Sequence, residues 1–246
     1  MRVIFAGGGT GGHINPAISI ADYAKAQDEN FEAIFIGTKT GLETKLVPKA
    51  GYKLEFIDIK GFDRKHLLKN VEVIKKLIES RAKMKKIIKD FKPDCIVCTG
   101  GYVSGPVTMA AKAAKIPALI HEQNVYPGLT VKGSEKYVDY VCPQIYWSFE
   151  HSICPFDKTV KEWAKLKKSD TVKLYIGIAA YKAGISSTEA KAAGDIGWSK
   201  TSSEMKKQVQ YGRSTNKVDG YMFYRYDNLI SSKVKKELSN LKKVLK

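Results

Sequence analysis

Residues 6–16 hold the residue types in this chain that are hardest to explain by packing alone. They read Ala-Gly-Gly-Gly-Thr-Gly-Gly-His-Ile-Asn-Pro and lie between an apolar segment and a helical segment. Glycines let the backbone approach a ligand closely, and the free N–H groups at the start of the next helix attract an anion. The segment therefore predicts a phosphate-binding loop, with Pro16 in the first turn of the helix.

The spacing of these glycines matches neither of the two common nucleotide-binding patterns. It differs from the dinucleotide-binding fingerprint, and no Gly-Lys-Ser/Thr follows it as in a P-loop. The alternative is a glycine-rich turn that binds nothing, in which His13 only caps the loop.

Two further segments of this kind follow apolar ones. Residues 99–106 read Thr-Gly-Gly-Tyr-Val-Ser-Gly-Pro, and residues 121–124 read His-Glu-Gln-Asn. The carboxyl ends of parallel strands meet at one edge of a sheet, and ligands bind there. All three segments should converge at that edge, where a histidine could accept the proton of a hydroxyl group. For Glu122 the alternative is the start of a surface loop.

These segments require an α/β fold with a buried parallel sheet. Apolar strands alternate with amphipathic helices over the first 130 residues, a rhythm that predicts a sheet covered by helices. The expected strands are 3–6, 33–36, 54–57, 95–98 and 118–121, and the expected helices are 16–27, 41–49, 64–90 and 105–114.

The composition limits the partners of the chain. The formal net charge is +17, and its densest stretch is residues 64–92, where lysines alternate with apolar residues at helical spacing. Such a helix has either a solvated basic face over a core face or an attraction to anionic lipid head groups. No aromatic interleaving, recognition-helix pattern or zinc knuckle accompanies the charge, so nucleic acid is not an expected partner.

The remaining composition points to a reducing cytoplasm. Cys95 and Cys98 fall in one expected strand and point to opposite faces, which favours core thiols over half a zinc site. We therefore expect no metal at these cysteines, and no cofactor is expected elsewhere in the chain. No run of eighteen apolar residues is present, and the chain enters its first strand without a signal peptide.

The first 130 residues resemble the N-terminal, acceptor-binding domain of MurG-type transferases. The resemblance rests on residues 7–16, 100–106 and 121–124 and on Pro-Gly-Leu-Thr at 127–130, although Val131 stands where the family usually has asparagine. It implies a two-domain, metal-independent GT-B enzyme that transfers N-acetylglucosamine from UDP-N-acetylglucosamine to a lipid-linked muramyl-pentapeptide. The basic helical region would then dock at the inner leaflet of the cell membrane.

The resemblance also assigns site residues. His13 would lie near the acceptor hydroxyl, and Glu122 and Asn124 would orient the sugar, so that His13 and Glu122 are the catalytic candidates. The acceptor and its diphosphate would be held by Gly8, Gly9, Thr10, Gly11, Gly12, His13, Asn15, Gly100, Gly101, Tyr102, Ser104, Gly105 and Asn124.

The second half of the chain resembles another family. After about Lys132 the transferase resemblance is expected to stop, and residues 137–245 resemble the late-barrel part of glycosyl-hydrolase-like (β/α)₈ lipoproteins. Expected strands are 138–145, 174–179 and 220–224, expected helices are 157–166, 202–214 and 231–245, and residues 184–197 are expected to form a loop. Strand ends in such barrels bind sugars. The sugar-facing candidates are Gln144, Tyr146, Trp147, Arg225 and Asp227, with packing as the alternative role.

Together these patterns predict a Rossmann-like parallel sheet over residues 1–131 joined to three βα units over residues 132–246. The functional expectation is a truncated or chimeric glycosyltransferase that holds its acceptor and lacks the donor half needed for catalysis. Two alternatives stay open: a carbohydrate-active hydrolase, which would need two carboxylates flanking the bond, and a non-catalytic module that binds lipid diphosphates at a membrane surface.

Overall fold

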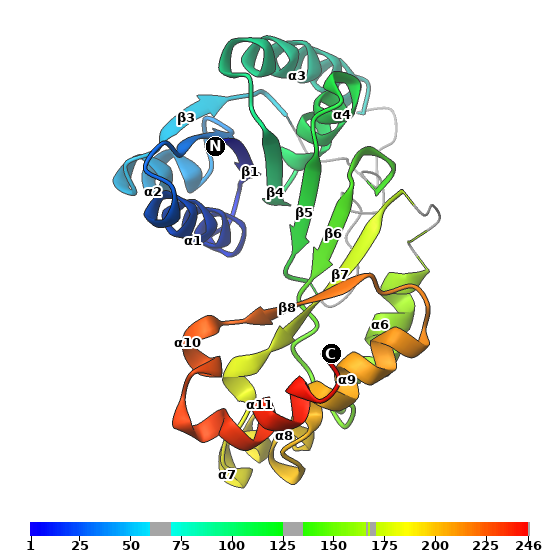
Figure 1. Cartoon of the computed structure of the whole chain (residues 1–246). Coiled ribbons are helices and arrows are strands. Elements are labelled where there is room, and N and C mark those ends of the chain that lie inside the picture. The colour runs from blue at the N-terminus through cyan, green and yellow to red at the C-terminus, as the bar shows by residue number, and fades with distance from the viewer. Residues whose placement is uncertain (60–69, 125–134, 166, 168–170, 246) are drawn as a thin grey trace. The chain divides into compact units, whose positions relative to one another are not determined.

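The computed structural model describes residues 1–59, 70–124, 135–165, 167 and 171–245 (Figure 1). The chain divides into two compact units. The described part of the first unit is residues 1–59, 70–123 and 135–141, and that of the second is residue 124 with residues 142–165, 167 and 171–245.

The first unit is a parallel α/β sheet, as the sequence predicts. Its strand order is β3-β2-β1-β4-β5, and every strand pairs in parallel with its neighbour. In chain order the elements are β1 (Arg2–Gly7), α1 (Gly11–Gln27), β2 (Glu32–Gly37), α2 (Glu43–Lys49), β3 (Lys53–Phe56), α3 (Asn70–Phe91), β4 (Cys95–Gly100), α4 (Ser104–Ala114), β5 (Ala118–Glu122) and η2 (Glu135–Tyr137). β6 (Tyr140–Pro143) begins in this unit and ends in the second.

Both faces of this sheet are buried at its central strands, which explains why β1 and β2 contain continuous apolar runs, whereas the edge strand β3 alternates charged and apolar residues. Val3 and Phe5 of β1 pack with Ala17 of α1 and with Phe35 of β2, whose ring stacks on that of Phe5 at 5.0 Å. Ile4, next to them in sequence, is fully buried on the opposite face. Because the sheet is covered on both sides, its carboxyl edge is where loops remain open to a ligand.

The start of the first helix differs from the expectation. α1 begins at Gly11, so that Pro16 lies inside the helix rather than in its first turn. Thr10 precedes it in an extended conformation, and its carbonyl accepts the N–H groups of His13 and Ile14. Two glycines of the loop, Gly11 and Gly12, are therefore the first residues of the helix.

The second unit contains β7 and β8, which pair in parallel, and the helices that follow them. Its elements are α6 (Phe156–Ala164), β7 (Lys173–Ala179), η3 (Ala180–Lys182), α7 (Ser187–Ala192), α8 (Gly197–Lys200), α9 (Glu204–Ser214), β8 (Gly220–Tyr224), α10 (Tyr226–Leu229), η4 (Ser232–Val234) and α11 (Lys235–Lys242). β8 is the last strand in the sheet order, so the described strands of this unit form an open sheet rather than a closed barrel. The expected resemblance to part of a (β/α)₈ barrel is therefore not confirmed.

Residues 184–197, expected to be a loop, contain the helices α7 and the start of α8. Ser186 and Glu189 form a capping box at the N-terminus of α7, with each side chain bonded to the other's backbone N–H. The spacing of these two residues is the capping-box signature. The expectation was wrong because it read the small residues of this stretch as a loop and overlooked that signature.

Candidate functional site

The two glycine loops of the first unit pack closely against each other through backbone and side-chain atoms. A Cβ added to Gly101 would lie 2.6 Å from the carbonyl oxygen of Gly8, and one added to Gly100 would lie 2.3 Å from Nδ1 of His13. Both residues have positive φ angles, +82° and +114°. The hydroxyl of Thr99 also donates to the carbonyl of His13 at 2.6 Å. These glycines are required by packing between the loops, whatever else they do.

A second group of glycines faces open space. Apart from the adjoining residues in the chain, a Cβ added to Gly9 or Gly105 would meet no atom within 4 Å, and one added to Gly11 or Gly12 would make only ordinary contacts. The backbone N–H groups of Gly11 and Gly12 have no partner among the described residues. Free N–H groups beside an open surface at the start of a 17-residue helix are the arrangement that binds an anion.

A buried carboxylate holds the first loop in place. Glu43 is fully buried, and its carboxylate accepts the N–H of Gly9 at 2.9 Å and both the N–H and the hydroxyl of Thr38 at 2.8 Å. Burial alone would raise the pKa of Glu43, but the hydrogen bonds from Thr38 and Gly9 outweigh it and lower that pKa. Glu43 is therefore ionised at neutral pH and fixes the turn at Gly9.

The hydrogen bonds around His13 determine which ring nitrogen bears the proton. Nδ1 of His13 lies 2.9 Å from the carbonyl oxygen of Thr99, an atom that only accepts, so Nδ1 carries the hydrogen. It also lies 3.0 Å from Oε1 of Gln123, whose amide nitrogen donates to the same Thr99 carbonyl at 2.9 Å. In the neutral imidazole Nε2 then has the lone pair, which can accept a proton from a substrate hydroxyl.

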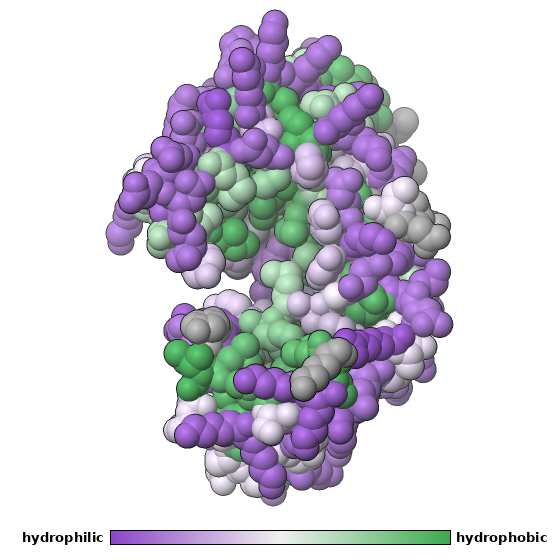
Figure 2. Space-filling view, in the orientation of Figure 1, coloured by the Kyte–Doolittle hydropathy of each residue, from purple (hydrophilic) through white to green (hydrophobic). Residues whose placement is uncertain are grey.

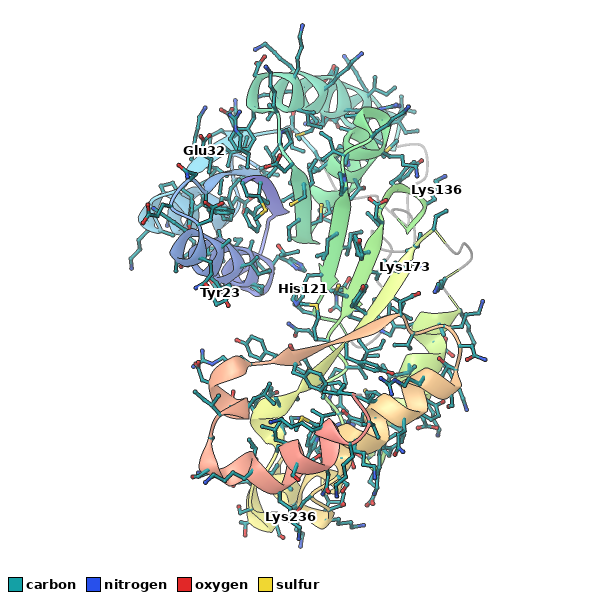
Figure 3. All side chains as sticks on the ribbon, viewed as in Figure 1. Tyr23, Glu32, His121, Lys136, Lys173 and Lys236 are labelled. Carbon is teal, nitrogen blue, oxygen red and sulfur yellow. The ribbon has the colours of Figure 1, made fainter. Side chains whose placement is uncertain are left out.

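His121 extends this network as a neutral group. The amide nitrogen of Gln123 lies 3.4 Å from Nδ1 of His121, which is labelled on β5 in Figure 3. Burial, with a smaller contribution from His13, lowers the pKa of His121 to about 4. His121 is uncharged at neutral pH and adds no positive charge beside His13.

The other predicted residues of the first unit fall into exposed and buried groups. Thr10, Asn15 and Tyr102 are exposed beside the loops, and Tyr102 is 63% exposed. Ser104 is buried, and its hydroxyl donates to the carbonyl of Gly100 at 3.1 Å. Its position favours a role in shaping the second loop.

Glu122 and Asn124 lie on either side of Gln123. Glu122 is buried at 4% exposure, whereas Asn124 is exposed and belongs to the second unit. Residues 127–131, which carry part of the predicted acceptor motif and the Val131 departure, lie outside the described residues.

The predicted sugar-facing residues of the second unit are not one cluster of polar groups. Tyr146 packs against Tyr181 at 5.8 Å and Tyr224 at 6.0 Å between ring centroids, in an aromatic cluster. Arg225 and Asp227 form an exposed ion pair at 2.9 Å.

Gln144 and Trp147 take part in the packing of the second unit. Gln144 bridges in parallel to Gly177 of β7. The ring of Trp147 packs on that of His151 at 5.9 Å, and its carbonyl accepts the amide of Gln208. These contacts agree with the packing alternative for both residues.

Sequence reasoning missed Glu43, Thr99 and Gln123 as parts of the site. Each has a signal in hindsight: Glu43 follows the carboxyl end of β2 and so lies at the ligand edge of the sheet, and the other two lie within the motifs already recognised. Among the described residues no group of three or more His, Cys, Asp or Glu side chains could hold a metal ion.

This parallel α/β unit, with glycine loops at its carboxyl edge, is a glycosyltransferase domain. Residues 3–143 match the glycosyltransferase family 28 N-terminal domain, and the chain belongs to that family. The match continues past Lys132, where the resemblance was expected to stop, through the whole of β6.

Curated relatives of the chain have the printed name UDP-N-acetylglucosamine--N-acetylmuramyl-(pentapeptide) pyrophosphoryl-undecaprenol N-acetylglucosamine transferase. The protein from Ruminiclostridium cellulolyticum is 51% identical over 141 residues, which are 57% of this chain and 39% of that protein. The one from Lactobacillus delbrueckii subsp. bulgaricus is 44% identical over 170 residues, which are 68% of this chain and 43% of that protein. The chain thus spans about two-fifths of the length of the curated relatives it matches.

A solved structure shows the same fold. The crystal structure of Acinetobacter baumannii MurG superposes with a TM-score of 0.51 over 92% of this chain and 68% of that one, at 20% identity. This confirms the predicted parallel α/β fold, which is similar to the N-terminal domain of GT-B glycosyltransferases.

Proposed function

We propose that the first unit binds the diphosphate of a lipid-linked muramyl-pentapeptide acceptor, in the transfer of N-acetylglucosamine from UDP-N-acetylglucosamine. The observation that supports this most is the pair of free N–H groups on Gly11 and Gly12 beside glycines without neighbours. A diphosphate supplies the charge that such N–H groups attract. The relatives named above act, by their names, on a pyrophosphoryl-undecaprenol substrate.

His13 is the proposed general base of this transfer. Its Nδ1 is held as a donor by Thr99 and Gln123, which leaves the Nε2 lone pair for the acceptor hydroxyl. As that hydroxyl attacks the anomeric carbon, its proton passes to Nε2 and UDP leaves with the bonding electrons. Glu122 and Asn124 are proposed to orient the sugar, as the family resemblance implies. The groups that hold the donor nucleotide lie outside the first unit in this proposal.

Binding is tested with farnesyl diphosphate, a soluble polyprenyl diphosphate, by isothermal titration. We expect Gly12→Leu to weaken binding about tenfold or more, because its side chain enters the open surface beside the free N–H groups. Ala26→Leu, on an exposed residue of the same helix, is the matched control. Equal binding by the two variants would refute the proposed diphosphate site.

Transfer is tested separately by the release of UDP in the presence of a lipid acceptor. Release that is lost in His13→Gln supports the general-base role. Binding of the diphosphate without any UDP release supports the alternative of a non-catalytic binding module. Hydrolysis of an aryl glycoside that is lost in Asp227→Asn would support the hydrolase, although the exposed Arg225–Asp227 pair has the geometry of a surface ion pair.

We propose further that α3 docks on the inner face of the cell membrane. Val71, Ile74 and Ile78 lie on one helical face and are 71%, 49% and 65% exposed. Lys85 and Lys89 continue the same face toward the C-terminus of the helix, and the part of the first unit that holds α3 is mostly purple in Figure 2. Apolar insertion and attraction to anionic lipid act together on such a helix. Among the described residues no helix is long and apolar enough to cross a membrane.

Co-sedimentation with vesicles of phosphatidylglycerol and phosphatidylcholine tests this docking. We expect salt to weaken binding, and Ile74→Ser with Ile78→Ser to weaken it more than Tyr23→Ser, an exposed aromatic residue on α1 of the same unit. Binding that is insensitive to the α3 substitutions would refute the assignment of this face.

A further inference from the structure

The second unit has a pocket of about 450 Å³ that the proposed function does not use. It is formed by the segments that follow β7 and β8, including the connection between α8 and α9 and the start of α11. In parallel α/β folds the segments after the strands are where small molecules bind. Pockets of roughly 300–1,000 Å³ hold small ligands.

Two lysines at this pocket form no close ion pair within the described chain, although the charge of Lys233 helps to lower the pKa of the Glu189 carboxyl. Lys233 lies on η4 and Lys236, labelled in Figure 3, lies on α11. Both are exposed, and neither forms an ion pair with a described residue, whereas a third lysine of the lining, Lys200, is paired with Glu150. Gly184 packs against the carbonyl of Lys233, where an added Cβ would come within 2.7 Å, so the backbone that bears this lysine is fixed against the pocket lining.

A buried donor at the pocket also lacks a partner. Trp198 lines the pocket at 2% exposure, and its indole Nε1 has no hydrogen-bond acceptor among the described residues. An unsatisfied buried N–H is costly and needs an explanation such as a ligand oxygen. The hydroxyls of Thr201 and Ser202 also line the pocket and form no side-chain hydrogen bond within the described chain.

The acidic residue of the lining does little to repel an anion. Glu237 is 4% exposed, and its carboxylate accepts the N–H of Met205 at 2.6 Å. Burial and then the charge of Glu204 raise the pKa of Glu237 to about 7, against the weaker opposing effect of that hydrogen bond. The pocket thus has two exposed cations that form no close ion pair with a described residue, and a carboxylate that is partly protonated at neutral pH.

We propose that this pocket binds a sugar phosphate. Lys233 and Lys236 would bind the phosphate group, and the hydroxyl lining with the indole N–H of Trp198 would bind sugar oxygens. A bare phosphate ion would leave most of a pocket of this size empty, so a polar organic group of about monosaccharide size is needed to fill it.

The test is isothermal titration of the full chain with glucose 6-phosphate, glucose and inorganic phosphate at fixed ionic strength. We expect glucose 6-phosphate to bind at least about tenfold more tightly than the other two. Lys233→Gln with Lys236→Gln should weaken it at least about tenfold, and Lys191→Gln with Lys235→Gln, two exposed lysines outside the lining, should change it less than about twofold.

A measurement on the unchanged chain avoids any loss of folding. The three tryptophans, Trp147, Trp163 and Trp198, give three indole N–H signals by NMR, and glucose 6-phosphate should shift that of Trp198 most. Absence of binding at millimolar concentration, equal binding by the two lysine variants, or inorganic phosphate binding as tightly as glucose 6-phosphate would each overturn the proposal. An unshifted Trp198 signal upon binding would also overturn it.

Discussion

Two ionisable side chains in each unit have shifted pKa values, in opposite directions in the two units. In the first unit the pKa values of Glu43 and His121 are lowered, so the folded state favours the deprotonated forms. In the second unit burial raises the pKa values of Glu204 and Glu237, so the folded state favours the protonated forms. The first unit should therefore lose stability in acid and the second as the pH rises.

The number of donors around each carboxylate explains the difference. Glu43 accepts hydrogen bonds from three donors, which is enough to outweigh its burial. Glu237 accepts one backbone N–H and lies near a second buried carboxylate, Glu204, which itself accepts the N–H of Phe149. Glu43 and Glu237 thus have opposite pKa shifts because Glu43 has three donors, whereas Glu237 has one donor and a second carboxylate nearby.

The largest expected effect concerns the backbone contacts of the first unit. Gly101→Ala should destabilise that unit by at least about 3 kcal/mol, because it combines a positive φ with a methyl group against the carbonyl of Gly8. It should also abolish binding of farnesyl diphosphate. Hydrogen exchange in β1 and β4 measures the effect on the unit.

Gly12→Ala is the matched control for that substitution. Its methyl group makes only an ordinary contact, 3.7 Å from the hydroxyl of Thr10, and alanine is the better helix former, so stability should stay the same or rise by up to about 0.5 kcal/mol. If the two variants had equal stability, the packing role assigned to Gly101 would be wrong.

The pH response is the next largest effect. The pKa of His121 is lowered in the folded state. Its contribution to the stability of the first unit is therefore present above the unfolded pKa near 6.5 and is lost as the pH falls toward about 4. The pKa of Glu237 is raised in the folded state. Its contribution to the stability of the second unit is therefore present below the unfolded pKa near 4.5 and is lost as the pH rises toward about 7. As the pH falls from about 7.5 to about 5, the free energy of unfolding of the first unit should decrease by roughly 2 kcal/mol, and that of the second unit should increase by roughly the same amount.

Each unit has its own probe for this experiment. All three tryptophans lie in the second unit, so their fluorescence follows that unit alone, and hydrogen exchange in β1 follows the first. The pKa of Asp219 in the second unit is lowered, so this residue changes the stability of that unit only below about pH 4, outside this range. Glu237→Gln should remove most of the response of the second unit. Stabilities that change in the same direction in both units would contradict the comparison.

Most of the first unit could be predicted from its sequence because its strands are short apolar runs between strong helices. The expected strand at 33–36 lies within β2, and the one at 118–121 lies within β5. The start of α1 could not be placed, since glycine and proline usually mark the outside of a helix and here Gly11 and Pro16 lie within it. Residues 64–69 of the third expected helix lie outside the described residues.

The candidate site was predicted less completely than the fold. Its glycines and His13 belong to a dense motif, but Glu43 is a single glutamate in a stretch without a motif, and only the fold shows that its carboxylate reaches Gly9. Sequence alone also could not separate glycines that pack, such as Gly101, from glycines that leave space, such as Gly9. That distinction depends on contacts between segments far apart in the chain.

A smaller loss of stability is expected when Glu43, the charged acceptor of the hydrogen bonds from Gly9 and Thr38, is replaced by a neutral residue. Glu43→Gln keeps the shape but turns an amide NH₂ toward donors, so the first unit should lose about 2 kcal/mol at neutral pH. Its stability below about pH 4.5 should approach that of the unchanged chain, because protonation of Glu43 removes the same charge. Glu29→Gln, on an exposed residue of the same unit, should leave the pH profile unchanged.

The smallest effect on stability tests the orientation of His13. Gln123→Leu removes one of the two acceptors at Nδ1 and should lower the stability of the first unit by about 1 kcal/mol. The Thr99 carbonyl still accepts from Nδ1, so the tautomer should persist while the ring becomes more mobile. Nitrogen-15 NMR of the imidazole distinguishes the two nitrogens directly. A proton on Nε2 of the neutral ring in the unchanged chain would contradict the assigned network and remove the lone pair that the proposed proton transfer requires.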